Sequence, residues 1–391
     1  MSDLSSRRPR IGIDLHVADG IFQGSRTHCL ELFSRVIDLT AECDFVVLAS
    51  DPNKLVSFSH SFALPYVRLI VMPPKSAAVR LLWQLPQAAR RYQISLLHTQ
   101  YIAPLAAPCA TALTVHDILF ESYPEYFEKS LVLRSRLLVP LSIRRSKAIF
   151  TVSNFSHKQI CDTYSIPRTK VHTIPNGVDI TRFFPGRSGL RAVEALGLEG
   201  DGYFLTVGRL EPRKNHATLL RAWAQFRVPR PRLVIVGQRH FNYREVFDLI
   251  KALGMESDVL VLEHVSDEEL PAIYRNARGF IYTSWAEGFG MPLLEAMASG
   301  IPVVTSATTA LTEVGAEAAL YVDPGKLSDI VAAINSLNGD AELRNRMIAR
   351  GLSRIKEFKW EKSAQTVKEV YLRHFGLSVG SGRTHPKHCD V

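Results

Sequence analysis

Short runs of Val, Ile and Leu alternate with longer helical segments along almost the whole chain. The runs are nearly continuous in apolar residues, which is typical of strands covered on both faces of a parallel sheet. Helices then supply the crossovers between strands. In the first half, a loop at 17–25 leads into a helix at about 26–40, and strands are predicted at 10–16, 44–50, 67–73, 94–100, 111–117 and 147–153.

The strand pattern restarts after residues 174–186. This segment, IPNGVDITRFFPG, contains Asn-Gly, two prolines and two glycines, and we interpret it as an interdomain link. Further strands are predicted at 203–210, 232–238, 259–265, 279–284, 302–306 and 319–324. At 391 residues the chain is also too long for one ordinary core. The predicted fold class is therefore α/β, with two tandem Rossmann-like doubly wound domains facing a central cleft.

Composition places the chain among soluble globular proteins, with 46% apolar and 22% charged residues. The longest apolar run, 102–115, has 14 residues and two prolines, and is too short and broken to span a bilayer. The N-terminal ten residues are polar, so we expect no signal peptide. Five scattered cysteines without a C-x-x-C pair indicate reduced thiols and a cytoplasmic location, with neither zinc nor disulfides.

The formal charge of +9 indicates polyanionic partners. Part of the excess lies in 134–147, which has five basic residues, no acids and leucines at a helical period. This stretch is either a solvated helix face or a helix that lies on a membrane surface. Pro140 is expected to kink or end the helix. Nothing resembles an RNA-recognition motif, zinc finger or helix-turn-helix, so we expect no nucleic-acid partner.

The stretch SWAEGFGMPLLEAMASGIPVVTS, 284–306, places Glu287 and Glu295 on either side of Gly288-Phe289-Gly290. A dinucleotide-binding loop is the first alternative, but its third glycine would fall on Leu293, and Glu287 would repel a pyrophosphate. Ionised carboxylates instead accept paired hydrogen bonds from vicinal hydroxyls. A nucleotide sugar carries such hydroxyls on two rings, so one acid for each ring is a physical fit.

The alternative for Glu295 is an ordinary charge that stabilises a helix N-terminus, because Pro292 suits the first position of a helix. If the two acids instead bind the hydroxyls of a nucleotide sugar, Glu295 faces the same cleft as Glu287.

A diphosphate joins the two rings of a nucleotide sugar, and the basic residues after another predicted strand suit it. Gly208 and Arg209 end the strand at 203–210, and Lys214 follows at the start of a helix. A guanidinium, an ammonium and helix-start N–H groups can neutralise a diphosphate without a metal. The alternative is a pair of solvated bases in a loop.

Two sites in the first half complete the candidate set. Gly24 and Ser25 precede a helix, where backbone amides can approach a phosphate, although a simple strand-to-helix turn fits equally well. His116 lies at the carboxyl end of a strand, where either a structural or a functional role is open.

Taken together, the chain resembles the retaining glycosyltransferases of family 4, which have the two-domain GT-B fold. The resemblance covers about residues 10 to 375. It rests on the Gly24 loop, Thr114-Val115-His116-Asp117, TVSNFS (151–156), IPNGVD (174–179), Gly208-Arg209 with Lys214, VSDEELPAIY (265–274) and EGFGMPLLEAMASGIPVV (287–304). The first loop departs from the pattern of many members, because QGSRTH has one glycine and not a pair.

The resemblance implies the following domains and roles. Residues 1–183 form an acceptor-binding domain, 184–357 a nucleotide-sugar-binding domain, and 358–376 a helix that crosses back to the first domain. The tail at 377–391 is expected to be disordered.

In the family, the positions of Arg209 and Lys214 contact the donor diphosphate and stabilise the leaving group. The position of Glu295 binds the ribose. The remaining implied donor contacts are Gly24, Ser25, Gly208, Val265, Glu287, Gly288, Phe289, Gly290 and Met291, with His116 beside the transferred sugar. Catalytic roles are thus expected for His116, Arg209, Lys214 and Glu287.

The implied reaction is transfer of a hexose with retention of configuration, with GDP-mannose the first candidate donor and UDP-sugars next. The leaving phosphate takes the acceptor proton in the usual description. No D-x-D occurs, which is consistent with a metal-independent enzyme without a cofactor. The expected acceptor is a saccharide, either free or linked to a polyprenyl diphosphate. The expected location is the cytoplasm, and the inner face of the plasma membrane is the alternative if the acceptor is lipid-linked. A sugar-nucleotide 2-epimerase and a non-catalytic nucleotide-sugar-binding or polyanion-binding protein are the alternatives.

Overall fold

The computed structural model describes residues 8–19, 24–198, 200, 202–227 and 230–377. Within these residues, the first parallel sheet has seven strands in the order β3-β2-β1-β4-β5-β6-β7. Its strands are β1 (Arg10–Asp14), β2 (Asp44–Ala49), β3 (Val67–Val71), β4 (Leu96–Gln100), β5 (Ala110–Thr114), β6 (Ala148–Thr151) and β7 (Val171–Thr173). The helices between them are α1 (Gly24–Leu39), α2 (Pro52–Phe58), α3 (Ala77–Val79), α4 (Leu85–Arg91), α5 (Leu119–Ser122), α6 (Lys129–Arg145) and α7 (Asn154–Tyr164).

The second sheet has the order β10-β9-β8-β11-β12-β13, and its five pairings are parallel. Its strands are β8 (Tyr203–Val207), β9 (Arg232–Val236), β10 (Val259–Leu262), β11 (Gly279–Tyr282), β12 (Val303–Ser306) and β13 (Ala319–Val322). The accompanying helices are α8 (Leu190–Ala195), α9 (His216–Trp223), α10 (Arg244–Ala252), α11 (Leu270–Arg275), α12 (Met291–Ala298), α13 (Thr309–Gly315), α14 (Leu327–Gly339), α15 (Ala341–Arg354) and α16 (Trp360–His374).

The predicted fold class, two parallel Rossmann-like sheets in tandem, is confirmed. Every predicted strand is present, and β7 is one that the sequence did not reveal. α6 continues for one more turn beyond Pro140, to Arg145, so the proline does not end the helix. Among the described residues no helix is both long and apolar enough to cross a bilayer.

Contacts group the chain into two compact units, which we call unit 1 (1–112 with 361–391) and unit 2 (113–360). The domain limit predicted at 183/184 falls between β7 and β8, and it stays a prediction. The predicted disorder of the tail concerns 378–391, which lie outside the described residues.

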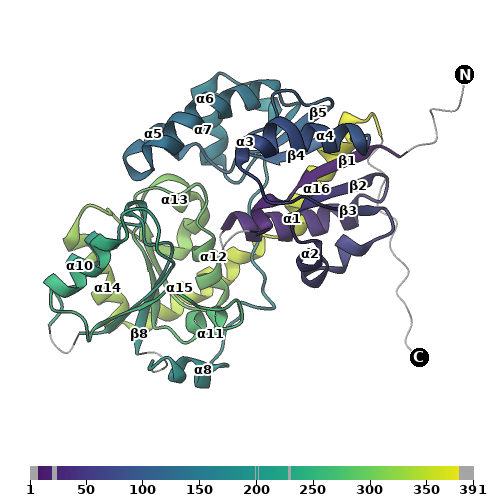
Figure 1. The fold of residues 1–391 in the computed structure, drawn as a ribbon. Helices are drawn as coiled ribbons and strands as arrows, with labels where there is room; N and C mark the ends of the chain where they lie inside the picture. The colour runs from purple at the N-terminus through teal and green to yellow at the C-terminus, as the bar shows by residue number, and fades with distance from the viewer. Residues whose placement is uncertain (1–7, 20–23, 199, 201, 228–229, 378–391) are drawn as a thin grey trace, which may run out of the picture. The chain divides into compact units, whose positions relative to one another are not determined.

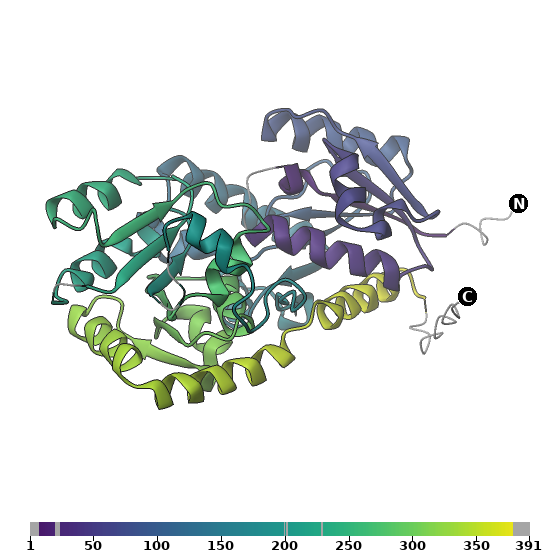
Figure 2. The ribbon, with the colours of Figure 1, turned by 90° about the horizontal axis from the view of Figure 1, so that it is seen from below.

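In unit 1, α16 lies alongside α1 (Figure 2). Arg35 of α1 donates to Glu361 at 2.7 Å, and the buried Tyr371 hydroxyl meets the Nδ1 of His98 on β4 at 2.5 Å. The opposite face of the sheet packs on α4, where Leu85 and Ala88 meet Leu97 of β4. A segment from the end of the chain thus completes the core of the first sheet.

In unit 2, alternate residues of each strand bury on opposite faces, as the pleat of a strand requires. Leu205 and Tyr282 pack toward α11, α12 and α13, in one apolar cluster. Phe204 and Ile281 pack toward α9, α10 and α14, in another. Figure 1 shows the second sheet between these two layers of helices. The strand order reverses direction between β8 and β11, which is the switch point where open parallel sheets bind ligands.

Candidate functional site

The loop after β8 carries Lys214 to the switch point. The N–H of Gly208 donates to the Val236 carbonyl at 2.9 Å, which holds the glycine against β9. A Cβ on Gly208 would lie 3.1 Å from Cε and 3.2 Å from Cδ of Lys214. The lysine stem therefore runs over the glycine, and the missing side chain is what gives it room.

Asn215, which the sequence analysis did not single out, fixes this loop to the neighbouring strand. Its backbone is left-handed, with φ 57°. Its side chain is buried and donates to the Thr283 carbonyl at 3.0 Å and the Pro324 carbonyl at 2.8 Å. Asparagine tolerates this backbone conformation. It thereby ties the β8 loop to the residue that follows β11.

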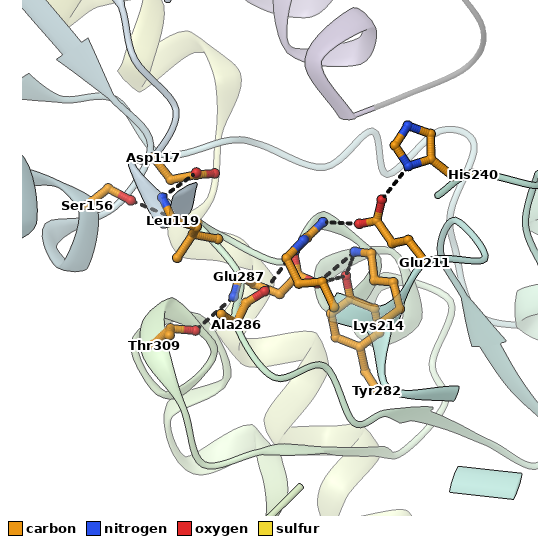
Figure 3. Close-up of polar contacts among 12 residues, drawn as sticks. Asp117, Leu119, Ser156, Glu211, Lys214, His240, Tyr282, Ala286, Glu287 and Thr309 are labelled. Atoms are coloured by element: carbon orange, nitrogen blue, oxygen red, sulfur yellow. Dashed lines mark hydrogen bonds and ion pairs between the residues drawn. The ribbon is translucent and has the colours of Figure 1, made fainter. Parts of the chain in front are cut away.

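Lys214 and Glu287 meet in an ion pair. Lys214 Nζ lies 2.7 Å from Glu287 Oε1 and donates to the Tyr282 hydroxyl at 2.6 Å (Figure 3). The Tyr282 hydroxyl in turn donates to the same carboxylate oxygen at 2.9 Å. The backbone N–H of Glu287 donates to the Thr309 hydroxyl at 2.9 Å. Two of the predicted catalytic residues are therefore brought together, with a tyrosine that the sequence analysis missed.

Arg213 is a second residue that the sequence analysis missed, although it directly precedes Lys214. Its guanidinium contacts Glu287 Oε2 at 2.8 Å, the Ala286 carbonyl at 2.8 Å and Glu211 Oε1 at 2.7 Å. The guanidinium thus lies between two buried carboxylates. Burial opposes its charge, but the carboxylates of Glu287 and Glu211 outweigh it and raise the pKa of Arg213.

The charges of this cluster are fixed by their neighbours. Burial alone would raise the pKa of Glu287, but the Arg213 and Lys214 cations lower it to about 2. For Lys214 burial dominates, so its pKa is lowered although Glu287 attracts the proton. The Glu287 carboxylate is therefore ionised at neutral pH, and both of its oxygens accept hydrogen bonds from protein groups.

Arg209 stands apart from this cluster. Its guanidinium is 3.4 Å from Nε2 of His240, whose Nδ1 is 3.1 Å from Glu211 Oε2. Among the residues that the structure describes, Arg209 makes no ion pair with a carboxylate. Burial lowers its pKa, which reflects a guanidinium partly withdrawn from water. Of the two predicted diphosphate ligands, Arg209 is thus the one that forms no ion pair with a carboxylate of the described residues.

The turn Gly288–Gly290 is held by the segment after β6. Its Gly288 carbonyl accepts hydrogen bonds from the hydroxyls of Ser153 at 2.7 Å and Ser156 at 3.4 Å. A Cβ on Gly288 would lie 2.7 Å from Cβ of Asp117. Gly290 has φ 103°, and Phe289 packs edge-on against Phe358 with ring centroids 5.8 Å apart. Glycine at 288 therefore allows the close approach of Asp117, and glycine at 290 allows the left-handed turn.

His116 is buried two residues beyond the end of β5, and its carbonyl accepts from the Thr151 hydroxyl at 3.1 Å. Its neighbour Asp117 is the residue that reaches Gly288. Burial raises the pKa of Asp117, and its Oδ1 accepts from the Leu119 N–H at 3.1 Å. His116 and Glu287 are thus in the same unit, and Asp117 makes the contact between their loops.

Glu295 has a different set of partners from Glu287. It lies on α12 and accepts a hydrogen bond from the buried Tyr274 hydroxyl at 2.8 Å. Burial raises the pKa of Glu295 to about 7, and the hydrogen bond from Tyr274 only partly offsets that effect. The structure therefore does not bring Glu295 into the Lys214–Glu287 network, and its expected contact with a ribose stays a prediction.

The remaining donor residues are placed as follows. Met291 is the first residue of α12, and the partly buried Val265 packs against the same apolar cluster as Phe289. Gly24 and Ser25 are the first two residues of α1 in unit 1. In the part of the chain that the structure describes, no three His, Cys, Asp or Glu side chains gather as ligands for a metal ion.

Comparison with known families gives two matches that together cover most of the chain. Residues 192–354 match the family described as "Glycosyl transferases group 1". Residues 22–182 match the family described as "Glycosyltransferase Family 4".

Two curated relatives and one solved structure show the extent of the similarity. The O-antigen chain mannosyltransferase B of Escherichia coli is 35% identical over 66% of this chain and 69% of its own length. The O-antigen chain mannosyltransferase RfbU of Salmonella typhimurium is 31% identical over 58% of this chain, which spans 60% of that protein. The structure of HepE from Anabaena in complex with UDP and glucose has a TM-score of 0.75 at 20% identity, over 93% of this chain and 100% of that chain.

Proposed function

The chain belongs to the group 1 glycosyltransferases, and from that membership we propose that it transfers a hexose from a nucleoside-diphosphate sugar to a saccharide acceptor. Mannose is the first candidate for the hexose, because the two curated relatives are named O-antigen chain mannosyltransferases. Their names also support a role in the biosynthesis of a bacterial surface polysaccharide. We propose retention of the anomeric configuration and no requirement for a metal ion.

The observation that carries this proposal is the pairing of Lys214 with Glu287 at the carboxyl ends of β8 and β11. When the bond between the sugar and the diphosphate breaks, negative charge develops on the leaving oxygen. Arg209 lies in the loop after β8 without a carboxylate partner among the described residues, and it can meet that charge. Lys214 can do the same when a phosphate competes with Glu287 for its ammonium group.

Glu287 has a positioning role in this proposal. Its pKa of about 2 and its three hydrogen-bonding partners, Lys214, Arg213 and Tyr282, leave it a weak base and a poor nucleophile. Glu287 orients the cations of Lys214 and Arg213, and it can accept a hydrogen bond from a hydroxyl of the transferred sugar. The leaving phosphate is then the base that takes the acceptor proton.

The other expected roles complete the donor site of the proposal. Glu295 accepts from the ribose hydroxyls once it is ionised, and Val265 packs beside the base. The turn of Gly288, Phe289 and Gly290, with Met291 at the start of α12, contacts the sugar. Gly208 leaves room for Lys214. Gly24 and Ser25 approach the phosphates, and His116 lies beside the transferred sugar.

The acceptor in this proposal is a saccharide on a polyprenyl-diphosphate carrier, so the enzyme works at the inner face of the membrane. α6 suits that location, because Leu133 and Leu137 are 75% and 63% exposed and Arg134 lies between them. An amphipathic basic helix of this kind binds the surface of anionic bilayers. Peripheral association through α6 is therefore part of the proposed function.

The test is a transfer assay with the purified protein. GDP-mannose and a panel of UDP-sugars are each offered with a polyprenyl-diphosphate saccharide, with and without EDTA, and the anomeric configuration of the product is read by NMR. The proposal expects transfer with retention, unaffected by EDTA. A nucleotide sugar at about 100 times its dissociation constant should also raise stability by about 2.7 kcal/mol. Epimerisation of the donor without an acceptor, or binding without turnover, would contradict the proposal.

A further inference from the structure

A continuous helical stretch from Ala77 to Arg91 in unit 1 has an unusual outer face. α3 is followed directly by the π-helical turn η3 (Arg80–Gln84) and then by α4. Pro86 lies in the first turn of α4, and a proline cannot donate to the preceding turn, which accounts for the local widening. The inner face of the stretch, with Leu85 and Ala88, is buried against the sheet.

The outer face of the first half of this stretch is apolar. Val79, Leu82 and Trp83 are 40%, 66% and 60% exposed, and Ala77 and Ala78 beside them are exposed as well. The outer face of a helix on a soluble protein normally carries polar side chains. Large apolar groups gathered on such a face indicate an interaction surface. We call Ala77–Trp83 the outer apolar segment.

The segment is fixed in orientation by Arg80, its one basic residue, which is half-buried. Arg80 bonds to the buried carboxylate of Asp14 at the end of β1, and its guanidinium also lies 2.7 Å from Nδ1 of His16. This link turns one side of the helix inward. Val79, Leu82 and Trp83 are consequently held outward, so the face exists without a partner and needs no rearrangement to bind one.

The charge around the segment favours an anionic partner. Residues 52–116 contain no Asp or Glu and five Lys or Arg besides Arg80, which pairs with Asp14, and the exposed Lys75 lies two residues before the segment. Each basic group near an anionic membrane surface contributes roughly 1 kcal/mol of attraction. Tryptophan has an apolar ring and a polar N–H, and is enriched where lipid tails meet head groups.

We propose that the outer apolar segment docks into the head-group region of an anionic bilayer, with Leu82 and Trp83 as the inserted side chains. The inference rests on the proposed function in that a lipid-linked acceptor brings the enzyme to a membrane, and it adds a second membrane contact on a surface of unit 1, separate from α6. The occupant is the lipid surface itself, and neither a peptide nor a second copy of the chain.

The test measures binding of the full chain to vesicles by co-sedimentation. Wild-type protein is expected to bind vesicles with about 30% phosphatidylglycerol and to bind pure phosphatidylcholine far more weakly. The double substitution Leu82→Ser with Trp83→Ser is expected to lower the partition coefficient about tenfold or more. Ile180→Ser is the matched control, because Ile180 is 63% exposed and lies beside Asp179. The control should bind like the wild type.

Fluorescence gives an independent readout. Trp223 and Trp360 are buried, and the half-buried Trp285 stacks on Tyr126, so Trp83 should dominate any blue shift caused by vesicles. Trp83→Phe should remove the shift while retaining most of the binding. Binding of the double variant equal to the wild type would overturn the proposal, even if Leu133→Ser with Leu137→Ser abolished binding through α6. If the wild type and the double variant differ in oligomeric state in the absence of lipid, a second copy of the chain is the occupant of the segment. That result would also overturn the proposal.

A last measurement separates this inference from the proposed function. The double variant should transfer sugar to a short, water-soluble acceptor at the wild-type rate, and should lose rate only with an acceptor presented in vesicles. If neither the wild type nor the double variant transfers sugar to the soluble acceptor, the proposed function is contradicted. Equal rates with the vesicle-bound acceptor would contradict the membrane contact alone.

Discussion

Lys214 and Glu287, 73 positions apart in the sequence, form a buried ion pair of 2.7 Å that joins the loops after β8 and β11. The two strands are neighbours at the switch point of the second sheet, where the strand order reverses. The ion pair therefore lies where a parallel sheet of this kind binds its ligand. Arg213 and Tyr282 complete its hydrogen bonds, so the cluster is ordered before any substrate arrives.

Replacing Lys214 with Ala is expected to lower kcat by two to three powers of ten, or about 3–4 kcal/mol of barrier, because a preplaced cation for the leaving diphosphate is lost. Steady-state kinetics with the preferred donor provide the measurement. Lys326→Ala is the matched control, since Lys326 is 65% exposed and pairs with Asp323 at 3.7 Å. The control should retain its rate. A Lys214→Ala enzyme that is folded and as fast as the wild type would remove the lysine from the mechanism.

The strands were predicted well, but their carboxyl ends were not. Nine of the twelve predicted strands extend two or three residues too far, and β8 ends at Val207 where the sequence pattern continues to Leu210. Val115 and Leu210 are fully buried although both lie outside strands. An apolar pattern reports burial, and it cannot distinguish a strand from a buried loop that follows one. β7 was missed because three residues are too few to carry a pattern.

The candidate site was predicted only in part. Lys214 and Glu287 follow strands that the pattern identified, and the topology brings such ends together. Tyr282 and Asn215 gave no signal, because their roles depend on contacts 68 positions away with Lys214 and Thr283. No sequence signal pointed to the hydrogen bond that the Tyr274 hydroxyl donates to Glu295, and the shared orientation of the two acids stays a prediction.

Gly177 gives a further example. It belongs to the IPNGVD segment, and a Cβ there would lie 2.6 Å from the backbone nitrogen of Trp360. The glycine is thus required by a segment 183 positions away, at the start of α16. Its conventional interpretation as a turn residue explains nothing about that contact.

Gly208→Ala is expected to reduce activity with little loss of stability. The added Cβ would lie 3.1 Å from Cε of Lys214, closer than most carbon contacts, so the flexible lysine must shift and its ion pair with Glu287 is disturbed. We expect kcat/KM to fall about tenfold, at a cost to stability of about 1 kcal/mol or less. The control is Gly339→Ala, where a Cβ meets no atom within 4 Å. Kinetics and thermal unfolding on both variants are the measurements, and equal activities would contradict the expectation.

The buried carboxyl of Glu295 makes the free protein less stable as pH rises. Burial raises the pKa of Glu295 to about 7, whereas an unfolded glutamate titrates near 4.5. Between these two values the unfolded chain has lost the proton and the folded chain still holds it, so the free energy of unfolding falls as pH increases. The expected loss is about 3 kcal/mol, complete just above pH 7.

Glu295→Gln isolates this effect, because the amide cannot titrate. The difference in unfolding free energy between the wild type and Glu295→Gln, from denaturant titrations at a series of pH values, should change by about 3 kcal/mol between about pH 4.5 and 7 and stay level above that. Glu342→Gln is the control, since Glu342 is 84% exposed and should give a flat difference. A flat difference for Glu295 as well would mean that its carboxyl is already ionised in the folded protein.

Glu313→Ala is expected to destabilise the junction between the second sheet and the segment after β6. The two carboxylate oxygens of Glu313 accept from the N–H groups of Asn154 and Phe155, each at 2.9 Å, and so cap the N-terminus of α7. The helix dipole adds to the attraction. Loss of this cap should cost about 1–2 kcal/mol in unfolding free energy.

The same change should also weaken the hold on the catalytic turn, because Ser153 at the N-cap of α7 bonds to the Gly288 carbonyl at 2.7 Å. Activity should therefore fall more for Glu313→Ala than for Glu317→Ala, whose side chain lies on the same stretch of chain without such a cap. Glu313→Asp is too short to reach both N–H groups and should behave like Glu313→Ala. If Glu313→Ala unfolds at the wild-type denaturant concentration, the cap contributes no stability and the link to the turn has no energetic basis.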